Sequence, residues 1–194
     1  MKKAVFIDKD GTLIKNVPYN VNTRLITFEE QVIPALRLLQ SHGYQLIVIS
    51  NQDGVAFDYF TEEDVQHVYQ FMATQLLLQG IRLNGFYYCP HHVDGTNEVY
   101  KKACYCRKPM PGLLLEAAME MDIDLERSWM IGDILNDCEA GNRAGCATIL
   151  LNMGNETEWV LNNNRRPNYV CSNWSEAAGI IIQYANAKAS VEHV

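Results

Sequence analysis

Two acidic residues separated by a single position, Asp8 and Asp10, end a short apolar run in the segment VFIDKDGT at residues 5–12. In an open parallel sheet, ligands bind at the carboxyl ends of the strands, so acids placed there face a crevice. Side chains two residues apart point to the same side of a strand, and two close carboxylates repel each other unless a cation lies between them or one keeps its proton. The segment therefore suits a Mg²⁺ site with one acid as nucleophile and the other as proton shuttle, although solvated Asp-rich turns also have this pattern.

Two further apolar runs end in polar residues. The run at 44–49 is followed by Ser50, whose hydroxyl, together with free backbone N–H groups at the strand end, could hold a phosphoryl oxygen. Taken alone, a hydrogen-bonded turn explains this serine better. The run at 128–132 is followed by Asp133 and Asp137, which are spaced one helical turn apart and can face one point at the top of a sheet.

A group of cysteine and histidine residues predicts a second metal site. Cys89 and His91 form one close pair, and Cys104 and Cys106 form another after the 12 residues from 92 to 103. Two such pairs are what a tetrahedral zinc site needs, and a site closed by four protein ligands is structural. Chance cysteines or redox thiols are the alternatives, and spacing alone does not rank His91 above its neighbour His92.

The elements that must position these residues alternate between strand and helix. Apolar runs predict strands ending at Asp8 and spanning 44–49, 84–89, 128–132, 146–151 and 168–171. Helical patterns and caps predict helices from a Thr27/Glu30 capping box to about 42, from Thr61 to about 79, from Pro111 to 121, over 134–144, and from an Asn173/Glu176 cap onward. This alternation predicts an α/β fold with a doubly wound, mainly parallel, Rossmann-like sheet flanked by helices.

Bulk properties limit the function classes. The chain has 194 residues and a net charge of -7, without a basic stripe, so we expect no nucleic-acid partner. It has neither an apolar run long enough for a membrane span nor a signal-peptide pattern, so we expect a cytoplasmic protein without a membrane partner. We expect one domain over 1–188 with a metal loop at 89–112, a frayed tail at 189–194, and a monomer. The intervals after the first two strands leave no room for a large cap domain.

The order of these motifs resembles that of the haloacid dehalogenase-like phosphohydrolases. The resemblance rests on Asp-x-Asp-Gly-Thr at 8–12, the strand-end Ser50, Lys108, and Gly-Asp-x-x-x-Asp at 132–137. The metal loop, with its long gap and the segment CYCRKPMPG at 104–112, is similar to that of the heptose bisphosphate phosphatases within this family. The related histidinol-phosphate phosphatases share the loop plan.

The resemblance implies roles for the matching residues. Asp8 is implied to be the nucleophile that forms an aspartyl-phosphate, and Asp10 the acid and base that serves the leaving oxygen and the water. Mg²⁺ is implied to bind Asp8, the Asp10 carbonyl and Asp133, with Asp137 orienting the site. The implied catalytic set is Asp8, Asp10, Ser50 and Lys108, and the implied substrate-binding set is Asp8, Lys9, Asp10, Tyr19, Asn20, Ser50, Asn51, Gln52, Arg107 and Lys108. The implied zinc ligands are Cys89, His91, Cys104 and Cys106.

Within these roles, Ser50, the Asn51 backbone and Lys108 hold the oxygens of the transferred phosphoryl group, and Arg107 recognises the substrate, including a phosphate that is not cleaved. The expected substrate is a small phosphorylated sugar, the 7-phosphate of heptose 1,7-bisphosphate being the leading case. Asp53 and Ile134 depart from the family pattern. An acid beside the phosphate would repel substrate unless it is turned outward or paired, and Ile134 supplies no cation after Asp133. Histidinol phosphate or another small phosphomonoester is the alternative substrate, and a non-catalytic zinc-knuckle module is the alternative class.

Overall fold

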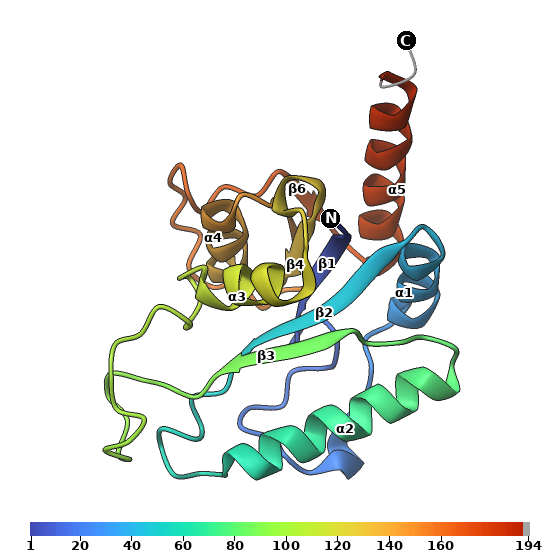
Figure 1. Ribbon diagram of the computed structural model, residues 1–194. Coiled ribbons are helices and arrows are strands. Elements are labelled where there is room, and N and C mark those ends of the chain that lie inside the picture. The colour runs from blue at the N-terminus through green and yellow to red at the C-terminus, as the bar shows by residue number, and fades with distance from the viewer. Residues whose placement is uncertain (192–194) are drawn as a thin grey trace.

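The computed structural model describes residues 1–191, with side chains through residue 187. Six parallel strands form one sheet in the order β3-β2-β1-β4-β5-β6 (Figure 1). Their bounds are β1 (Lys3–Asp8), β2 (Tyr44–Asn51), β3 (Gly85–Cys89), β4 (Trp129–Gly132), β5 (Ala147–Leu151) and β6 (Tyr169–Cys171). The chain runs outward from β1 to β3, returns to β4 on the other side of β1, and continues to β6. This doubly wound order confirms the predicted fold class.

Helices cover both faces of the sheet, as Figure 1 shows. They are α1 (Val32–Ser41), α2 (Glu62–Leu78), α3 (Gly112–Met121), α4 (Leu135–Ala144) and α5 (Trp174–Val191), with short 3-10 turns at Thr23–Leu25 and Leu125–Arg127. Alternate residues of β1 serve the two faces: Val5 and Ile7 pack with α1, α2 and α5, whereas Ala4 and Phe6 pack with α3 and α4. Because both faces are covered, β1 is apolar from Ala4 to Ile7 and becomes polar only at Asp8.

Two of the predicted helix caps are present. Thr61 accepts a hydrogen bond from the Asp64 backbone N–H at 3.2 Å, and the Asp64 carboxylate accepts one from the Thr61 N–H at 2.8 Å, which completes a capping box. Asn173 accepts from the Glu176 N–H at 2.9 Å at the start of α5. The side chain of Glu176 accepts from the Ser172 N–H rather than closing a box with Asn173.

The predicted start of α1 is wrong. The helix begins at Val32, after Gln31 in a left-handed conformation with φ of 63° and without a side-chain cap, and not at a Thr27/Glu30 box. Residues 27–29 instead pair with residues 13–15, and the Thr27 carbonyl accepts from the Lys15 N–H at 2.8 Å. Pairing across the loop therefore holds this segment out of the helix, and a local capping motif could not reveal that.

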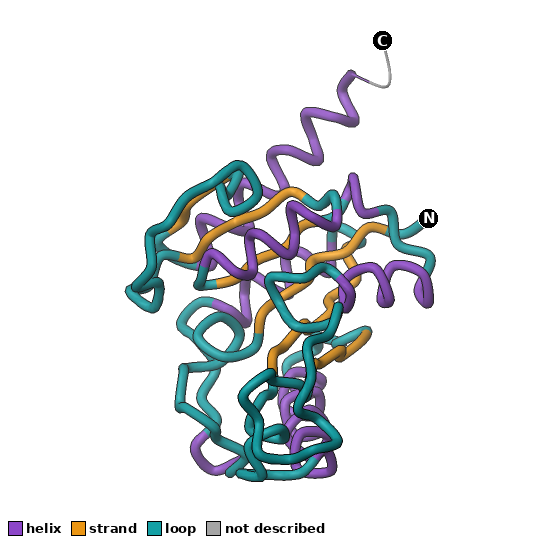
Figure 2. Tube along the Cα trace, turned by 90° about the vertical axis from the view of Figure 1, so that its left-hand side faces the viewer, coloured by secondary structure: helices purple, strands orange, loops and turns teal. Residues whose placement is uncertain are grey.

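The ends of the molecule differ in character. Loops gather at the end opposite the C-terminal part of α5, which stands clear of the body in both views (Figure 2). The last helix continues to Val191, so residues 189–191 of the expected frayed tail are helical and residues 192–194 lie outside the described part. None of the helices among residues 1–191 has both the length and the apolar character needed to cross a bilayer.

Candidate active site

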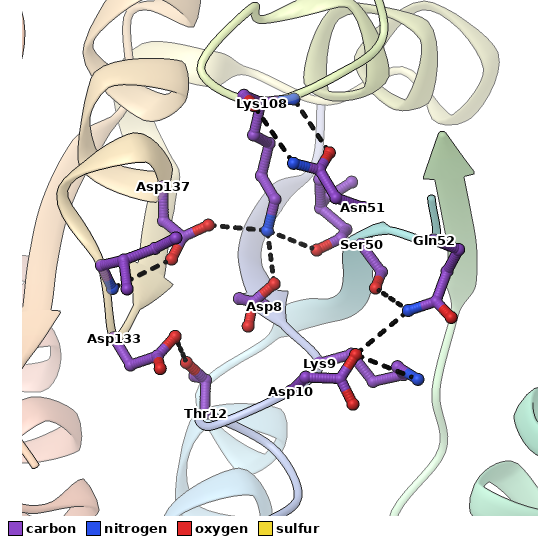
Figure 3. Close-up of polar contacts among 12 residues, drawn as sticks. Asp8, Lys9, Asp10, Thr12, Ser50, Asn51, Gln52, Lys108, Asp133 and Asp137 are labelled. Carbon is purple, nitrogen blue, oxygen red and sulfur yellow. Dashed lines mark hydrogen bonds and ion pairs between the residues drawn. The ribbon is translucent and has the colours of Figure 1, made fainter. Parts of the chain in front are cut away.

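Asp8 ends the central strand and lies at the centre of a buried polar cluster (Figure 3). The Lys108 ammonium donates to the Asp8 carboxylate, lies 2.6 Å from Asp137 Oδ1, and donates to the Ile49 carbonyl at 3.1 Å. Asp133 completes the group, because one carboxylate oxygen from each of Asp8, Asp133 and Asp137 lies within 4.8 Å of the others. The structure thus joins the ends of β1 and β4, the start of α4, and the segment before α3.

The cluster has more negative than positive charge. Burial raises the pKa of Asp8 to about 6, although Lys108 opposes this shift, and burial together with Asp8 and Asp137 raises the pKa of Asp133 to about 8. Burial lowers the pKa of Lys108, but Asp137 and Asp8 outweigh it and leave that pKa above its usual range. Three carboxylates face one ammonium, which leaves a formal charge of −2 when all are ionised. A divalent cation fits both this charge and the oxygen donors.

Asp10 has a different environment from Asp8. Its carboxylate accepts from Gln52 Nε2 at 3.1 Å and lies 3.1 Å from the Lys9 ammonium, and Gln52 also donates to Ser50 Oγ at 2.8 Å. Burial raises the pKa of Asp10, with Lys9 acting in the opposite direction. The Asp10 side chain therefore stands apart from the three-carboxylate group and suits an acid that gives up its proton to a neighbour.

Two glycines allow the acidic motifs to interlock. Gly11 has a φ of +88°, and a Cβ there would lie 2.2 Å from Asp133 Oδ2. At Gly132, a Cβ would lie 2.3 Å from Asp137 Cγ. No separate role was predicted for Thr12, yet its hydroxyl donates to Asp133 Oδ1 at 3.1 Å. The only signal for this contact is the position of the threonine directly after the Asp-x-Asp-Gly turn.

Lys108 is held in place through its backbone. Asn51 Nδ2 donates to the Lys108 carbonyl at 3.1 Å, and the Lys108 N–H donates to Asn51 Oδ1 at 3.0 Å. The side chain of Asn51 is thereby occupied, which leaves its backbone for the phosphate contact that the resemblance implies. The neighbouring Arg107 donates to Asp53 Oδ2 at 2.9 Å, so the unexpected acid is paired rather than free.

A cavity of about 250 Å³ opens beside Asp10. Its lining residues are Lys9, Asp10, Asn16, Val17, Pro18, Tyr19, Asn20, Asn51, Gln52 and Asp53. The loop after β1 and the end of β2 thus supply most of the predicted substrate-binding residues to one hollow. The Lys9 side chain is buried and occupied by Asp10, whereas Tyr19 is half exposed and meets Tyr59 edge to face at 4.8 Å.

The four predicted zinc ligands also converge. The Sγ atoms of Cys89, Cys104 and Cys106 lie 3.0–3.4 Å apart, and His91 Nδ1 lies 3.3 Å from Cys106 Sγ. His92 points elsewhere, since its Nδ1 accepts from the Asp94 N–H at 3.1 Å. All six cysteines of the chain are free thiols. Three sulfurs and one imidazole nitrogen at these separations fit a closed tetrahedral zinc site.

The long excursion of this metal loop is docked on the loop that follows β2. The Ala56 carbonyl accepts from the Thr96 and Asn97 N–H groups at 2.8 and 2.9 Å, and Asn97 Nδ2 donates to Asp58 Oδ1 at 2.7 Å. Tyr100 donates to Glu62 at the start of α2. These contacts hold the loop against the segment between β2 and α2, and within the described residues no separate cap domain stands over the site.

Loop 152–167, for which the sequence suggested no role, also contacts the site. Glu156 Oε2 accepts from the Leu135 N–H in the first turn of α4, next to Asp133 in the chain. Asn155 Nδ2 lies 3.5 Å from the Gly11 carbonyl. The loop therefore covers the segment that carries Asp133 and Asp137.

Comparisons with known proteins agree with this geometry. A family model described as HAD-hydrolase-like matches residues 105–177. The D-glycero-beta-D-manno-heptose-1,7-bisphosphate 7-phosphatase of Photorhabdus laumondii is 43% identical over 148 residues, 76% of this chain and 79% of that protein. The protein of the same name from Pasteurella multocida is 38% identical over 183 residues, 93% of this chain and 97% of that protein. The crystal structure of D,D-heptose 1,7-bisphosphate phosphatase from B. bronchiseptica, complexed with magnesium and phosphate, has a TM-score of 0.77 at 25% identity and covers 95% of this chain and 99% of that one.

Proposed function

This chain belongs to the D-glycero-beta-D-manno-heptose-1,7-bisphosphate 7-phosphatase family, and from that membership we propose that it removes the 7-phosphate of this heptose bisphosphate through an aspartyl-phosphate on Asp8. It is a phosphatase of the haloacid dehalogenase-like type. The observation that carries the proposal is the position of Asp8, which is buried at the end of the central strand between Lys108 and two further carboxylates.

In the first half of the reaction, an oxygen of the Asp8 carboxylate attacks phosphorus while the bond from phosphorus to the sugar oxygen breaks. Asp10 gives its proton to that leaving oxygen. The raised pKa of Asp10, which burial causes, keeps this proton available closer to neutral pH than an exposed aspartate would. Ser50, the Asn51 backbone and Lys108 stabilise the charge on the transferred phosphoryl oxygens.

In the second half, a water molecule attacks the phosphorus of the aspartyl-phosphate. Asp10, now ionised, takes a proton from this water, and the Asp8 carboxylate leaves as inorganic phosphate forms. Gln52 supports both halves by bonding to Asp10 and to Ser50, which keeps the acid near the group that it serves. Asp8 is then a free carboxylate again and Asp10 is protonated again, so these two residues complete the catalytic cycle.

The residues that would hold Mg²⁺ are Asp8, the Asp10 carbonyl and Asp133, with Asp137 as the partner that positions Lys108 beside them. When bound, the ion would offset the repulsion between a carboxylate nucleophile and a phosphate dianion. The formal charge of −2 on the cluster supports this assignment. So does the bacterial structure noted above, which was determined with magnesium and phosphate.

Zinc is proposed for Cys89, His91, Cys104 and Cys106, in a structural role. A closed set of four ligands has no open position for a substrate. The residue after the last of these cysteines is Arg107, and Lys108 follows it, so ordering the loop orders two cations of the site. Free thiols at all six cysteines support a cytoplasmic setting, and we expect the active protein to be a monomer without nucleic-acid or membrane partners.

The cavity beside Asp10 is the proposed place of the sugar. Tyr19 and Asn20 line it, and Arg107 is linked to it through its hydrogen bond to the lining residue Asp53. Polar and aromatic groups of this kind suit a ring with several hydroxyls better than an apolar metabolite. Ile134 supplies no charge next to Asp133, so substrate recognition rests on the groups around this cavity.

Phosphate release with Mg²⁺ tests the proposal directly. The panel contains both anomers of heptose 1,7-bisphosphate, histidinol phosphate and fructose 1,6-bisphosphate. We expect a strong preference for one heptose anomer, with release limited to the 7-phosphate. Weak, even rates across the panel would contradict the heptose assignment, and a preference for histidinol phosphate would favour the alternative substrate.

A further inference from the structure

A charge pair links Asp53, which lines the cavity, to Arg107. The sequence indicated that this acid would repel substrate unless it was turned outward or paired. Arg107 Nη2 lies 2.9 Å from Asp53 Oδ2, and their side chains are 30% and 23% exposed. Asp53 lines the cavity together with Tyr19. Burial and then Asp53 raise the pKa of the Tyr19 hydroxyl, whereas Arg107 lowers it, so the three groups share one electrostatic environment.

The other cations next to the predicted site are paired as well. Lys9 contacts Asp10, and Lys108 contacts Asp8 and Asp137. Arg107, to which the resemblance assigns a second, uncleaved phosphate, is paired too, because Asp53 already occupies one edge of its guanidinium. A phosphate dianion arriving there must displace a carboxylate or share the arginine with it, and either event places two like charges close together.

We propose that Asp53 sets the selectivity between sugar bisphosphates and monophosphates by competing with the second phosphate for Arg107. The inference rests on the proposed function, because it concerns the end of the substrate that is not hydrolysed. With Asp53 present, the guanidinium is shared, so a second phosphate gains less from Arg107 than it would from an unpaired arginine. Without its charge, the same guanidinium would be free for phosphate.

Arg107 does not depend on Asp53 for its position. Its Nη1 donates to the His91 carbonyl at 3.4 Å, and its backbone lies between Cys106 and Lys108. Cys106 belongs to the Cys/His cluster, and Lys108 is tied to Asn51 by two hydrogen bonds. Competition and positioning therefore predict opposite signs: loss of the Asp53 charge improves recognition of a second phosphate if the two compete, and weakens it if Asp53 only orients the arginine.

The experiment compares heptose 1,7-bisphosphate with heptose 7-phosphate, because the two substrates share the reacting end and differ only in the distal phosphate. The quantity measured is the ratio of their kcat/KM values. In Asp53→Asn we expect this ratio to rise about fivefold, the scale of a partly exposed charge interaction. The rise in the ratio should come from a lower KM for the bisphosphate. It should be smaller at high salt, because salt screens the partly exposed charges of Arg107 and Asp53.

Two variants control this result. Asp94→Asn removes the same charge from a carboxylate that is 82% exposed on the metal loop, and we expect it to leave the ratio unchanged. In an Arg107→Met background, Asp53→Asn should no longer raise the ratio, because the competition needs the guanidinium. A fall of the ratio in Asp53→Asn, no change, or an equal rise in the Arg107→Met background would overturn the inference.

Failure of the proposed function can be separated from failure of this inference. If the wild-type protein hydrolyses neither heptose compound, the substrate assignment is wrong, and the comparison is made between fructose 1,6-bisphosphate and fructose 6-phosphate. The predicted rise in Asp53→Asn is the same for this pair, since it depends on the second phosphate rather than on the sugar. A ratio that then stays constant counts against the role of Asp53.

Discussion

Within the carboxylate cluster, and likewise within the Cys/His cluster, the ligand atoms lie within 4.8 Å of one another. The two clusters differ in how far apart their residues are in the sequence. Asp8, Asp133 and Asp137 come from the ends of two strands and the first turn of a helix, and the three are almost fully buried. The Cys/His ligands all come from the end of β3 and the loop after it. One cluster is thus assembled from distant parts of the fold, whereas the other organises a single loop.

The two clusters also differ in charge balance. The carboxylates share Lys108 and have a formal charge of −2 when all are ionised. The raised pKa values of Asp8 and Asp133 indicate how unfavourable that arrangement is without a cation. The thiols and imidazole already number four, which leaves no free position around a tetrahedral ion. Removing a ligand from the first cluster should therefore stop the chemistry and spare the fold, and removing one from the second should loosen structure and reduce the chemistry indirectly.

The largest effect is expected at Asp8. Asp8→Asn replaces the nucleophilic carboxylate with an amide of nearly the same size, and kcat should fall about 10⁴-fold or more. The fold should persist, because Lys108 keeps Asp137 as its partner and one buried charge has been removed. Phosphate release measures the first expectation, and a thermal melt measures the second. Turnover at the wild-type rate would exclude the covalent mechanism, and an unfolded variant would contradict the separation of chemistry from fold.

A smaller effect is expected at Cys104. Cys104→Ser should release zinc and mobilise the loop, and kcat/KM should fall by up to about 100-fold because Arg107 and Lys108 are misplaced. The Mg²⁺ concentration for half-maximal activity should change little, since the carboxylates come from other segments. Zinc content by mass spectrometry and amide exchange over 89–108 measure the loss.

The matched control for this variant is Cys146→Ser, which changes a buried thiol outside the cluster. It should retain zinc and the exchange protection of the loop. If Cys104→Ser kept its zinc and its full activity, the assignment of the cluster would be wrong. If Cys146→Ser lost zinc to the same extent, the effect would reflect general destabilisation.

The sequence predicted what short-range patterns can encode. The Asp8/Asp10 motif follows an apolar run, and the helix cap at Thr61 depends on hydrogen bonds between residues close in the sequence, so both were predicted at the right residues. The doubly wound order followed from the alternation of strands and helices, since few topologies connect such elements. The family resemblance then supplied the roles that residue types alone left open, such as the choice of His91.

Contacts between distant segments could not be predicted in this way. The hydrogen bonds from Asn51 to the Lys108 backbone link residues that are 57 positions apart, and no local pattern marks them. The Thr27/Glu30 motif has the sequence of a cap, yet pairing with the loop after β1 prevents that role. Asp53 was expected to repel substrate unless paired, and only the structure identifies Arg107 as its partner.

The smallest effect, expected at Thr12, tests how far the fold assembles the carboxylate cluster. Thr12→Val removes the hydroxyl that donates to Asp133 Oδ1 at 3.1 Å and keeps the shape of a fully buried side chain. Residues that orient metal ligands in this manner affect metal affinity, so the Mg²⁺ concentration for half-maximal activity should rise about tenfold. The turnover number at saturating Mg²⁺ should stay close to that of the wild type.

Thr148→Val is the matched control, because Thr148 is equally buried and donates to Asn142 Oδ1 at 3.1 Å, away from the cluster. Thr12→Val should lose about 1 kcal/mol of stability through one lost hydrogen bond. Thr148→Val should lose more, because its hydroxyl also accepts from the Asn168 N–H at 3.2 Å, yet only Thr12→Val should shift the Mg²⁺ requirement. An unchanged requirement in Thr12→Val would mean that Asp133 needs no support from the turn after β1. An equal shift in both variants would mean that the Mg²⁺ requirement follows the stability of the protein. The carboxylate cluster would then depend on an intact fold and not on the hydrogen bond from Thr12.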